Sequence, residues 1–125
     1  MDDVYELFRR GTQLLEDGHH HQAVIPLSRA RDLAPDKASI REALGRALFH
    51  AQRYEQAALE FRALTERSPT NDYAQFCLGR SLQLLGRHAE ARGPLALAAC
   101  LQPSRRDYRR YRDQARARAA AFPGT

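Results

Sequence analysis

The chain has 125 residues, of which 43% are hydrophobic and 28% charged, and its net charge is +5. These proportions are typical of a folded domain with its own core, and they exclude an intrinsically disordered chain. No stretch approaches the roughly 18 consecutive apolar residues that a membrane-spanning helix needs, so we expect no membrane partner.

The chain begins with the acidic order Met1-Asp2-Asp3-Val4-Tyr5-Glu6. A secretory signal would start with basic residues and continue into an apolar run, and that order is missing here. We therefore expect a cytoplasmic location.

A period of 34 residues organises the sequence. Four columns recur three times at this spacing: Gly11, Gly45 and Gly79; Leu14, Leu48 and Leu82; Ala23, Ala57 and Ala91; Pro35, Pro69 and Pro103. Self-similarity at such a period indicates a repeat architecture. A glycine inside a helix costs about 1 kcal/mol relative to alanine, so a recurring one needs a packing reason. We expect the helices that carry Gly11 and Ala23 to lie almost in contact, with Leu14, Leu27 and Ala30 filling the space between repeats.

Each repeat is predicted to form two helices joined by a short turn. The first helices are expected at about residues 3–16, 37–50 and 71–84, and the second helices at about 20–33, 54–67 and 88–101. Turn residues such as Asp17-Gly18, Gln52-Arg53 and Leu85-Gly86 separate the two helices of a repeat. Pro26 and Pro94 fall inside second helices, where we predict a mild bend without a break because the apolar period continues beyond them.

A seventh helix is predicted over about residues 105–121. Tyr108, Tyr111, Ala115 and Phe122 share one apolar face of it, and arginines cover the remainder. A stack of repeats needs a terminal element with a polar outer side, which this helix supplies. Residues 122–125 are expected to form a frayed tail.

One motif joins the columns into a recognisable pattern. It reads Leu44-Gly45-x2-Leu48…Ala57-x3-Phe61…Pro69 and recurs as Leu78-Gly79-x2-Leu82…Ala91-x3-Leu95…Pro103. With it, the chain resembles tetratricopeptide repeat (TPR) proteins over residues 4–103. The chain departs from the family at the aromatic opening slot, which holds Leu7, Arg41 and Gln75, and at the Tyr slot, which holds Leu.

The resemblance implies an all-α fold, namely a right-handed α-solenoid of three antiparallel TPR helix pairs with a seventh capping helix. The repeats would cover about residues 4–37, 38–71 and 72–105, and the capping helix about 105–121. Together they would form a single domain over residues 1–121.

The resemblance also implies a binding site, because the first helices of TPR repeats line a concave groove that holds a peptide or a helix of a partner. Helical spacing places on one face of these helices Tyr5, Phe8, Thr12, Glu42, Arg46, Phe49, Tyr73, Phe76, Arg80 and Gln83. Aromatic and Arg side chains often carry binding energy. The alternative for Phe8 and Phe76 is that they belong to the core between repeats.

Some TPR domains clamp the carboxylate of a chaperone's C-terminus with Lys, Asn and Arg. The matching positions here hold Phe8, Thr12, Ala43, Tyr73 and Cys77, so that clamp is absent. Arg46 and Arg80 nevertheless suit an acidic group of a ligand.

The arginine-rich end of the chain is a second candidate site. Residues 105–118 hold seven Arg and two Asp, which accounts for the whole net charge. An anionic partner such as nucleic acid would contact Arg105, Arg106, Arg109, Arg110, Arg112, Arg116 and Arg118. The alternative is a solvated cap, because Tyr108 and Tyr111 have the spacing of a buried face.

Nothing in the sequence indicates catalysis. His19-His20-His21 do not converge on one metal ion, because neighbouring side chains point apart, and His20 occupies a packing position of the repeat. Cys77 and Cys100 suggest neither a disulfide framework nor a zinc site, and we expect both to be buried as small apolar residues. No nucleophile–base arrangement or phosphate-binding loop is present. We expect no enzyme activity and no cofactor.

The function expected from the sequence is a non-catalytic adaptor or scaffold that binds a peptide or helix of another protein in the groove. Two alternatives stay open: an anion- or nucleic-acid-binding role for the arginine-rich helix, and a small secretion-type TPR chaperone. Self-association is a further open alternative.

Overall fold

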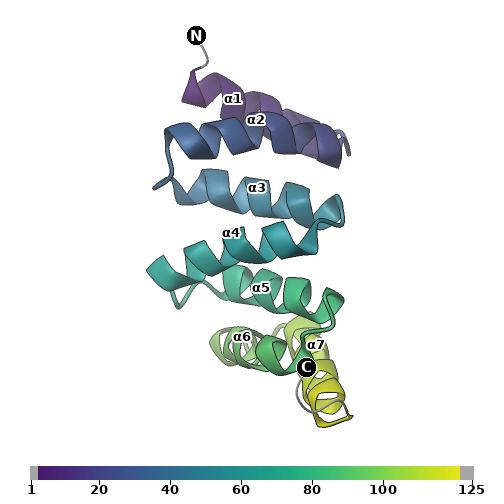
Figure 1. The fold of residues 1–125 in the computed structure, drawn as a ribbon. Helices are drawn as coiled ribbons and strands as arrows, with labels where there is room; N and C mark the ends of the chain where they lie inside the picture. Colours follow the sequence, from purple (N-terminus) through teal and green to yellow (C-terminus); the bar gives the residue numbers. More distant parts are fainter. Residues whose placement is uncertain (1–2, 122–125) are drawn as a thin grey trace. The chain divides into compact units, whose positions relative to one another are not determined.

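The computed structural model describes residues 3–121, and this part of the chain contains seven helices and no strand (Figure 1). They are α1 (Val4–Glu16), α2 (His20–Leu33), α3 (Ala38–His50), α4 (Tyr54–Arg67), α5 (Asp72–Leu84), α6 (His88–Leu101) and α7 (Arg106–Ala121). Every helix end lies within one residue of the predicted range, which confirms the helix prediction. The tail 122–125, including Phe122 of the predicted apolar face, lies outside the described residues.

The chain forms two compact units, Met1–Glu60 and Phe61–Thr125, with the boundary inside α4. In the first unit α2 packs against both α1 and α3, and α1 also touches α3. In the second unit α6 packs against both α5 and α7, and α5 also touches α7. The single-domain organisation stays a prediction.

Each turn within a helix pair has the same hydrogen-bonded geometry. His19, Arg53 and Arg87 donate their amide N–H to the carbonyls of Leu14, Leu48 and Leu82 at 2.8, 2.8 and 2.9 Å, so the repeated Leu column also closes the turn. The residue before each donor has a positive φ, which is 82° at Gly18, 79° at Gly86 and 63° at Gln52. Glycine accepts this conformation without strain, whereas Gln52 adopts it at a cost.

Gly11 and Gly79 allow close packing inside the first and third pairs, although the neighbouring side chain differs from the expected one. A Cβ added to Gly11 would lie 2.4 Å from Cγ of Leu27, and one added to Gly79 would lie 2.4 Å from Cγ of Leu95. Leu27 therefore fills space inside its own pair, which corrects the expectation that it lies between repeats. Ala23 is fully buried beside this contact on α2.

Side chains at the family's opening slot close the loops between repeats. Arg41 Nε donates to the carbonyl of Pro35 at 3.0 Å, and Gln75 Nε2 donates to that of Pro69 at 3.0 Å. Arg109 donates in the same way to Pro103. Because these donors are 34 residues apart, α7 has the register of a first helix, in an incomplete fourth repeat.

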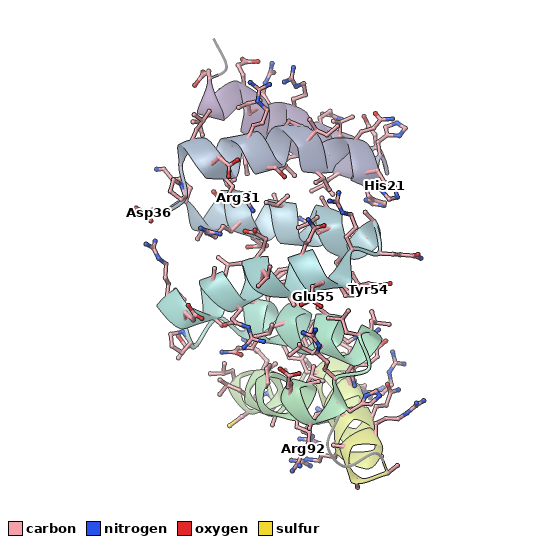
Figure 2. All side chains as sticks on the ribbon, in the orientation of Figure 1. His21, Arg31, Asp36, Tyr54, Glu55 and Arg92 are labelled. Carbon is pink, nitrogen blue, oxygen red and sulfur yellow. The ribbon has the colours of Figure 1, made fainter. Side chains whose placement is uncertain are left out.

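The helices α2 and α6 run without interruption through Pro26 and Pro94. The predicted absence of a break is confirmed, and the bend stays a prediction. Repeat two has Glu60 at this position, and its nearly buried carboxylate pairs with Arg31 at 2.5 Å and with Arg41 at 2.9 Å. The acidic residue thus links α2, α3 and α4 within the first unit, with Arg31 extending from α2 (Figure 2).

The apolar core follows the helix faces that the repeat predicts, with one exception. A cluster of Leu7, Ala30 and Ile40 lies in the first unit, and a cluster of Ala98, Ala99 and Tyr108 in the second. The expected burial of the cysteines is wrong for Cys100, which is exposed, and Cys77 is only half-buried. Cys100 has an exposed position because the buried positions at that end of α6 belong to Ala98 and Ala99.

Candidate functional site

In the first unit, the predicted groove residues come from the adjacent helices α1 and α3. The α1–α3 face consists of Tyr5, Phe8 and Thr12 on α1 with Glu42, Arg46 and Phe49 on α3. Phe8 and Glu42 are equivalent in the repeat, as are Thr12 and Arg46, so the two helices present the same side. Their contact brings these two rows into one surface.

The side chains of the α1–α3 face differ in their exposure and in their contacts. Tyr5 is 67% exposed, and Arg46 is exposed without a hydrogen-bond or ion-pair partner among residues 3–121. Phe8 is half-buried against the Leu7 cluster, so it also contributes to the core of its unit. Phe49 packs edge-on against Tyr54, with ring centroids 5.4 Å apart. The face therefore combines the partly packed rings of Phe8 and Phe49 with the exposed ring of Tyr5 and the unpaired guanidinium of Arg46.

In the second unit, three of the four predicted groove residues contact α7. The Phe76 ring stacks on Tyr108 with centroids 4.5 Å apart, and the Arg80 guanidinium lies 3.9 Å from the ring centre of Tyr111. Gln83 Nε2 donates to the main-chain carbonyl of Tyr111 at 3.1 Å. The remaining predicted residue on α5, Tyr73, is 37% exposed. The seventh helix thus occupies much of the α5 side that the sequence assigned to a ligand.

Tyr108 is the residue that attaches α7. It is fully buried, and its hydroxyl donates to Oδ2 of Asp72 at 3.0 Å. Burial, then the hydrogen bond to Asp72, then the charge of that carboxylate raise the pKa of Tyr108 to about 12. The predicted apolar face of the helix is confirmed, because Tyr108 and Ala115 are buried and Tyr111 is half-buried.

A small cleft lies between α5, α6 and α7, entirely within the second unit. Its volume is about 150 Å³, and it is lined by Arg80, Gln83, Leu84, His88, Gln114 and Arg118. The sequence interpretation did not assign His88, Gln114 or Arg118 to a site with Arg80. The signal that could have found Gln114 is the register of α7, since Gln114 lies 34 residues after Arg80.

Most arginines of the predicted anionic-partner patch contact groups of their own unit. Arg105 donates two hydrogen bonds to Asp107, at 3.0 and 2.7 Å, and these bonds lower the pKa of that carboxyl. Arg112 pairs with Asp113 at 3.0 Å, and Arg116 lies 3.9 Å from the same carboxylate. Arg109 binds the Pro103 carbonyl, and Arg110 donates to the hydroxyl of Tyr111 at 2.9 Å.

Two arginines on α7 differ from the others. Arg106 and Arg118 are exposed, and neither has a hydrogen-bond or ion-pair partner within the described part of the chain. The hollow beside Arg106 also contains Asp107 and Asp113, whereas the cleft beside Arg118 has no acidic side chain in its lining. The surface of α7 is therefore of mixed sign, with uncompensated positive charge at the cleft.

His20, at the start of α2, packs as its repeat position predicts. The ring of His20 stacks on His50, with centroids 4.8 Å apart and planes at 28°. Partial burial, followed by the charges of His20 and Arg46, lowers the pKa of His50. Over residues 3–121 no three His, Cys, Asp or Glu side chains come together in a way that would hold a metal ion.

None of the helices between residues 3 and 121 combines the length and the apolar character that crossing a membrane requires.

Several known proteins are similar to this chain in sequence or in structure. Superkiller complex protein 3 of Mus musculus is 35% identical over 83 residues, which is 66% of this chain and 5% of that protein. The chain thus matches a small part of a much longer relative. The structure of MamA AMB-1 has a TM-score of 0.86 and 25% identity, covering 94% of this chain and 69% of that one.

A further solved structure has the same fold at low sequence identity. The first TPR of Spaghetti (RPAP3), bound to the HSP90 peptide SRMEEVD, has a TM-score of 0.85 and 14% identity, covering 94% of this chain and 93% of that one. These neighbours support an α-solenoid of TPR type. A sequence profile of the tetratricopeptide repeat family matches residues 8–72 and again residues 51–108, so that the matches cover most of the chain. The chain belongs to the tetratricopeptide repeat family.

Proposed function

We propose that this chain is a non-catalytic adaptor of the cytoplasm that binds a peptide or helical segment of a partner protein on the α1–α3 face. The family is in general a protein-interaction fold, and a structural neighbour was solved with a bound peptide. A catalytic role has no support in the arrangement of the described side chains.

The observation that carries this proposal is the exposure of both Tyr5 and Arg46 on the α1–α3 face. Tyr5 keeps 67% of its surface exposed, and the Arg46 guanidinium is exposed without a partner in residues 3–121. Both side chains are therefore accessible to a ligand. Tyrosine and arginine are the side chains most often found to dominate binding energy when a partner buries them.

The half-buried residues of the α1–α3 face support the same use. The two exposed side chains share this face with Phe8, Thr12, Glu42 and Phe49. Core contacts fix Phe8, and packing against Tyr54 fixes Phe49. A rigid surface loses little conformational entropy on binding. In the second unit, Tyr73 occupies the repeat position of Tyr5.

The test compares two double variants in a capture experiment. The Tyr5→Ala/Arg46→Glu variant alters the α1–α3 face, and Leu59→Ala/Arg92→Glu makes the same kinds of change at exposed positions of α4 and α6. Leu59 is 61% exposed, and Arg92 projects from α6 (Figure 2). Proteins captured from lysate of the native cells are quantified by mass spectrometry. We expect specific partners to be lost with the first variant and kept with the second, and equal capture by both would refute the proposal.

The arginine-rich helix α7 receives less support as a binding site, because four of its six arginines already contact groups of their own unit, as does Arg105 just before it. We propose that it acts mainly as a cap. Asp113 supports this role, because it occupies the position of Gly11 and Gly79, where a leucine of a following helix would need the space. The chaperone alternative predicts a dimer, which light scattering after size-exclusion chromatography distinguishes from a monomer.

A further inference from the structure

The cleft between α5, α6 and α7 is built for an anion. Two guanidinium groups, of Arg80 and Arg118, line it together with His88, and its lining contains no Asp or Glu. Arg105, just before α7, and Arg112, on α7, pair with carboxylates of their own unit. The positive charge of the cleft is therefore left for a group from outside.

Arg80 is held in place for this task. Its Nη1 donates to Oε1 of Gln83 at 2.9 Å, and its guanidinium carbon lies over the Tyr111 ring, 3.9 Å from the ring centre. Gln83 is itself fixed, because its Nε2 donates to the Tyr111 carbonyl. A guanidinium has five N–H donors, so these contacts orient Arg80 and leave donors for a ligand.

The side chains that α7 contributes to the cleft have no partner. Arg118 is exposed and has no hydrogen-bond or ion-pair partner in residues 3–121, and the Gln114 amide likewise has none. The two guanidinium groups and the amide are planar donor groups that line the same cleft. Arg pairs with carboxylates through two parallel hydrogen bonds, so this set of donors suits a carboxylate.

The cleft has room for a small ligand group. Its volume is about 150 Å³. This space accommodates a carboxylate with its first carbons.

We propose that this cleft binds one carboxylate, supplied by the C-terminus or by an acidic side chain of a peptide. The inference rests on the proposed function for the source of that group, since a partner protein is what would deliver it. The binding of the carboxylate itself is independent of the α1–α3 face, so the two proposals fail separately.

The experiment uses the full chain labelled with ¹⁵N and three acetylated tripeptides at low ionic strength. Acetyl-Ala-Ala-Ala with a free C-terminus offers a terminal carboxylate, acetyl-Ala-Glu-Ala-amide offers a side-chain carboxylate, and acetyl-Ala-Gln-Ala-amide is the neutral control. NMR spectra follow the Nε–H of Arg80 and the side-chain amide of Gln114. We expect saturable shifts with at least one acidic peptide, at a Kd of about 1–10 mM because only a few charge-assisted hydrogen bonds form. The acidic peptide that binds identifies the source.

Two variants with the same loss of charge provide the control. Arg118→Gln removes the free guanidinium from the cleft, and Arg106→Gln removes an equally exposed, unpaired guanidinium from the other end of α7. We expect Arg118→Gln to weaken binding by about 5–10-fold, the usual cost of one such contact, and Arg106→Gln to change it less than about twofold. Equal shifts with the neutral peptide, absence of shifts with both acidic peptides, or equal weakening by the two variants would overturn the proposal.

Binding of the probe by the Tyr5→Ala/Arg46→Glu protein keeps the two proposals apart. That variant leaves every residue of the cleft unchanged, so it should bind the acidic tripeptide like the parent chain. Loss of partner capture with intact probe binding would concern the α1–α3 face alone. Capture of partners by the parent chain without probe binding would refute the cleft and leave the proposed function standing.

Discussion

Replacing Tyr108 by Phe should remove a pH-dependent part of the stability of the second unit. The ring of Tyr108 is fully buried and stacks on Phe76, and phenylalanine preserves that packing. What Tyr108→Phe deletes is the hydroxyl that donates to Asp72 at 3.0 Å. The variant therefore isolates one hydrogen bond between α7 and α5.

The expected magnitude follows from that bond. A hydrogen bond to a charged acceptor contributes about 1.5–3 kcal/mol, so the free energy of unfolding at pH 7 should fall by about 2 kcal/mol. The pKa of Tyr108 is about 12 in the folded chain, compared with about 10 for an unfolded tyrosine. The folded state thus keeps its proton to higher pH than the unfolded state. The stabilisation is complete below pH 10 and falls by about 1.4 kcal/mol per pH unit above it, so that the contribution of about 2 kcal/mol is lost as the pH rises toward 12.

Urea unfolding followed by circular dichroism at pH 7, 9, 10 and 11 measures this effect. The difference in unfolding free energy between the parent chain and Tyr108→Phe should be constant up to about pH 9 and should shrink by about 1.4 kcal/mol at pH 11. The other tyrosines are common to both proteins, so their ionisation cancels in the difference. Tyr111→Phe is the matched control, because it removes a hydroxyl whose donor is the exposed Arg110.

The reasoning fails if the parent chain and Tyr108→Phe lose stability in parallel above pH 9. It also fails if Tyr111→Phe reduces the loss of stability above pH 9 as much as Tyr108→Phe does. Either result would mean that the hydroxyl of Tyr108 does not hold its proton through Asp72.

Three further substitutions test how single side chains affect the stability of the helix pairs. Gln52→Gly should raise the free energy of unfolding by up to about 1 kcal/mol and so raise the urea midpoint, because a residue with a side chain pays about 1–2 kcal/mol for the φ of 63° at Gln52. An unchanged midpoint would contradict this. Gly79→Ala should lower stability by about 1–3 kcal/mol, since its Cβ would lie 2.4 Å from Cγ of Leu95; a neutral result in thermal unfolding would contradict it. His50 has a lowered pKa through burial and through the charge of His20, so the unfolded state takes up the proton first and stability is lost as the pH falls below about 6.5. His50→Gln should reduce that loss in melting curves between pH 7 and 5, and an identical loss in both proteins would refute it.

Residue spacing predicted the helices well because each helix end depends on neighbours in sequence. The turn bond from His19 to Leu14 spans five residues, and the cap from Asn71 to Ala74 spans three. Local hydrogen bonds of this kind are visible in a single sequence as turn and cap residues. The same argument explains why every helix end agrees within one residue.

The candidate site could be predicted only in part. Tyr5 and Arg46 were placed on the exposed face by helical spacing, and they are exposed in the structure. Spacing cannot tell what lies opposite a face, and so it did not predict that α7 contacts Phe76 and Arg80, which were assigned to the groove. The cleft with Gln114 was missed for the same reason.

The sequence by itself determined the repeat, the family, the helix bounds and which side of each helix is apolar, since these follow from periods and contacts within a few residues. Only the tertiary structure decided that Tyr108 reaches Asp72, 36 residues away, and that Glu60 joins Arg31 and Arg41. These pairs depend on how different helices pack against each other. The sequence pattern does not specify that packing, because many partners are compatible with the same polar or aromatic residue.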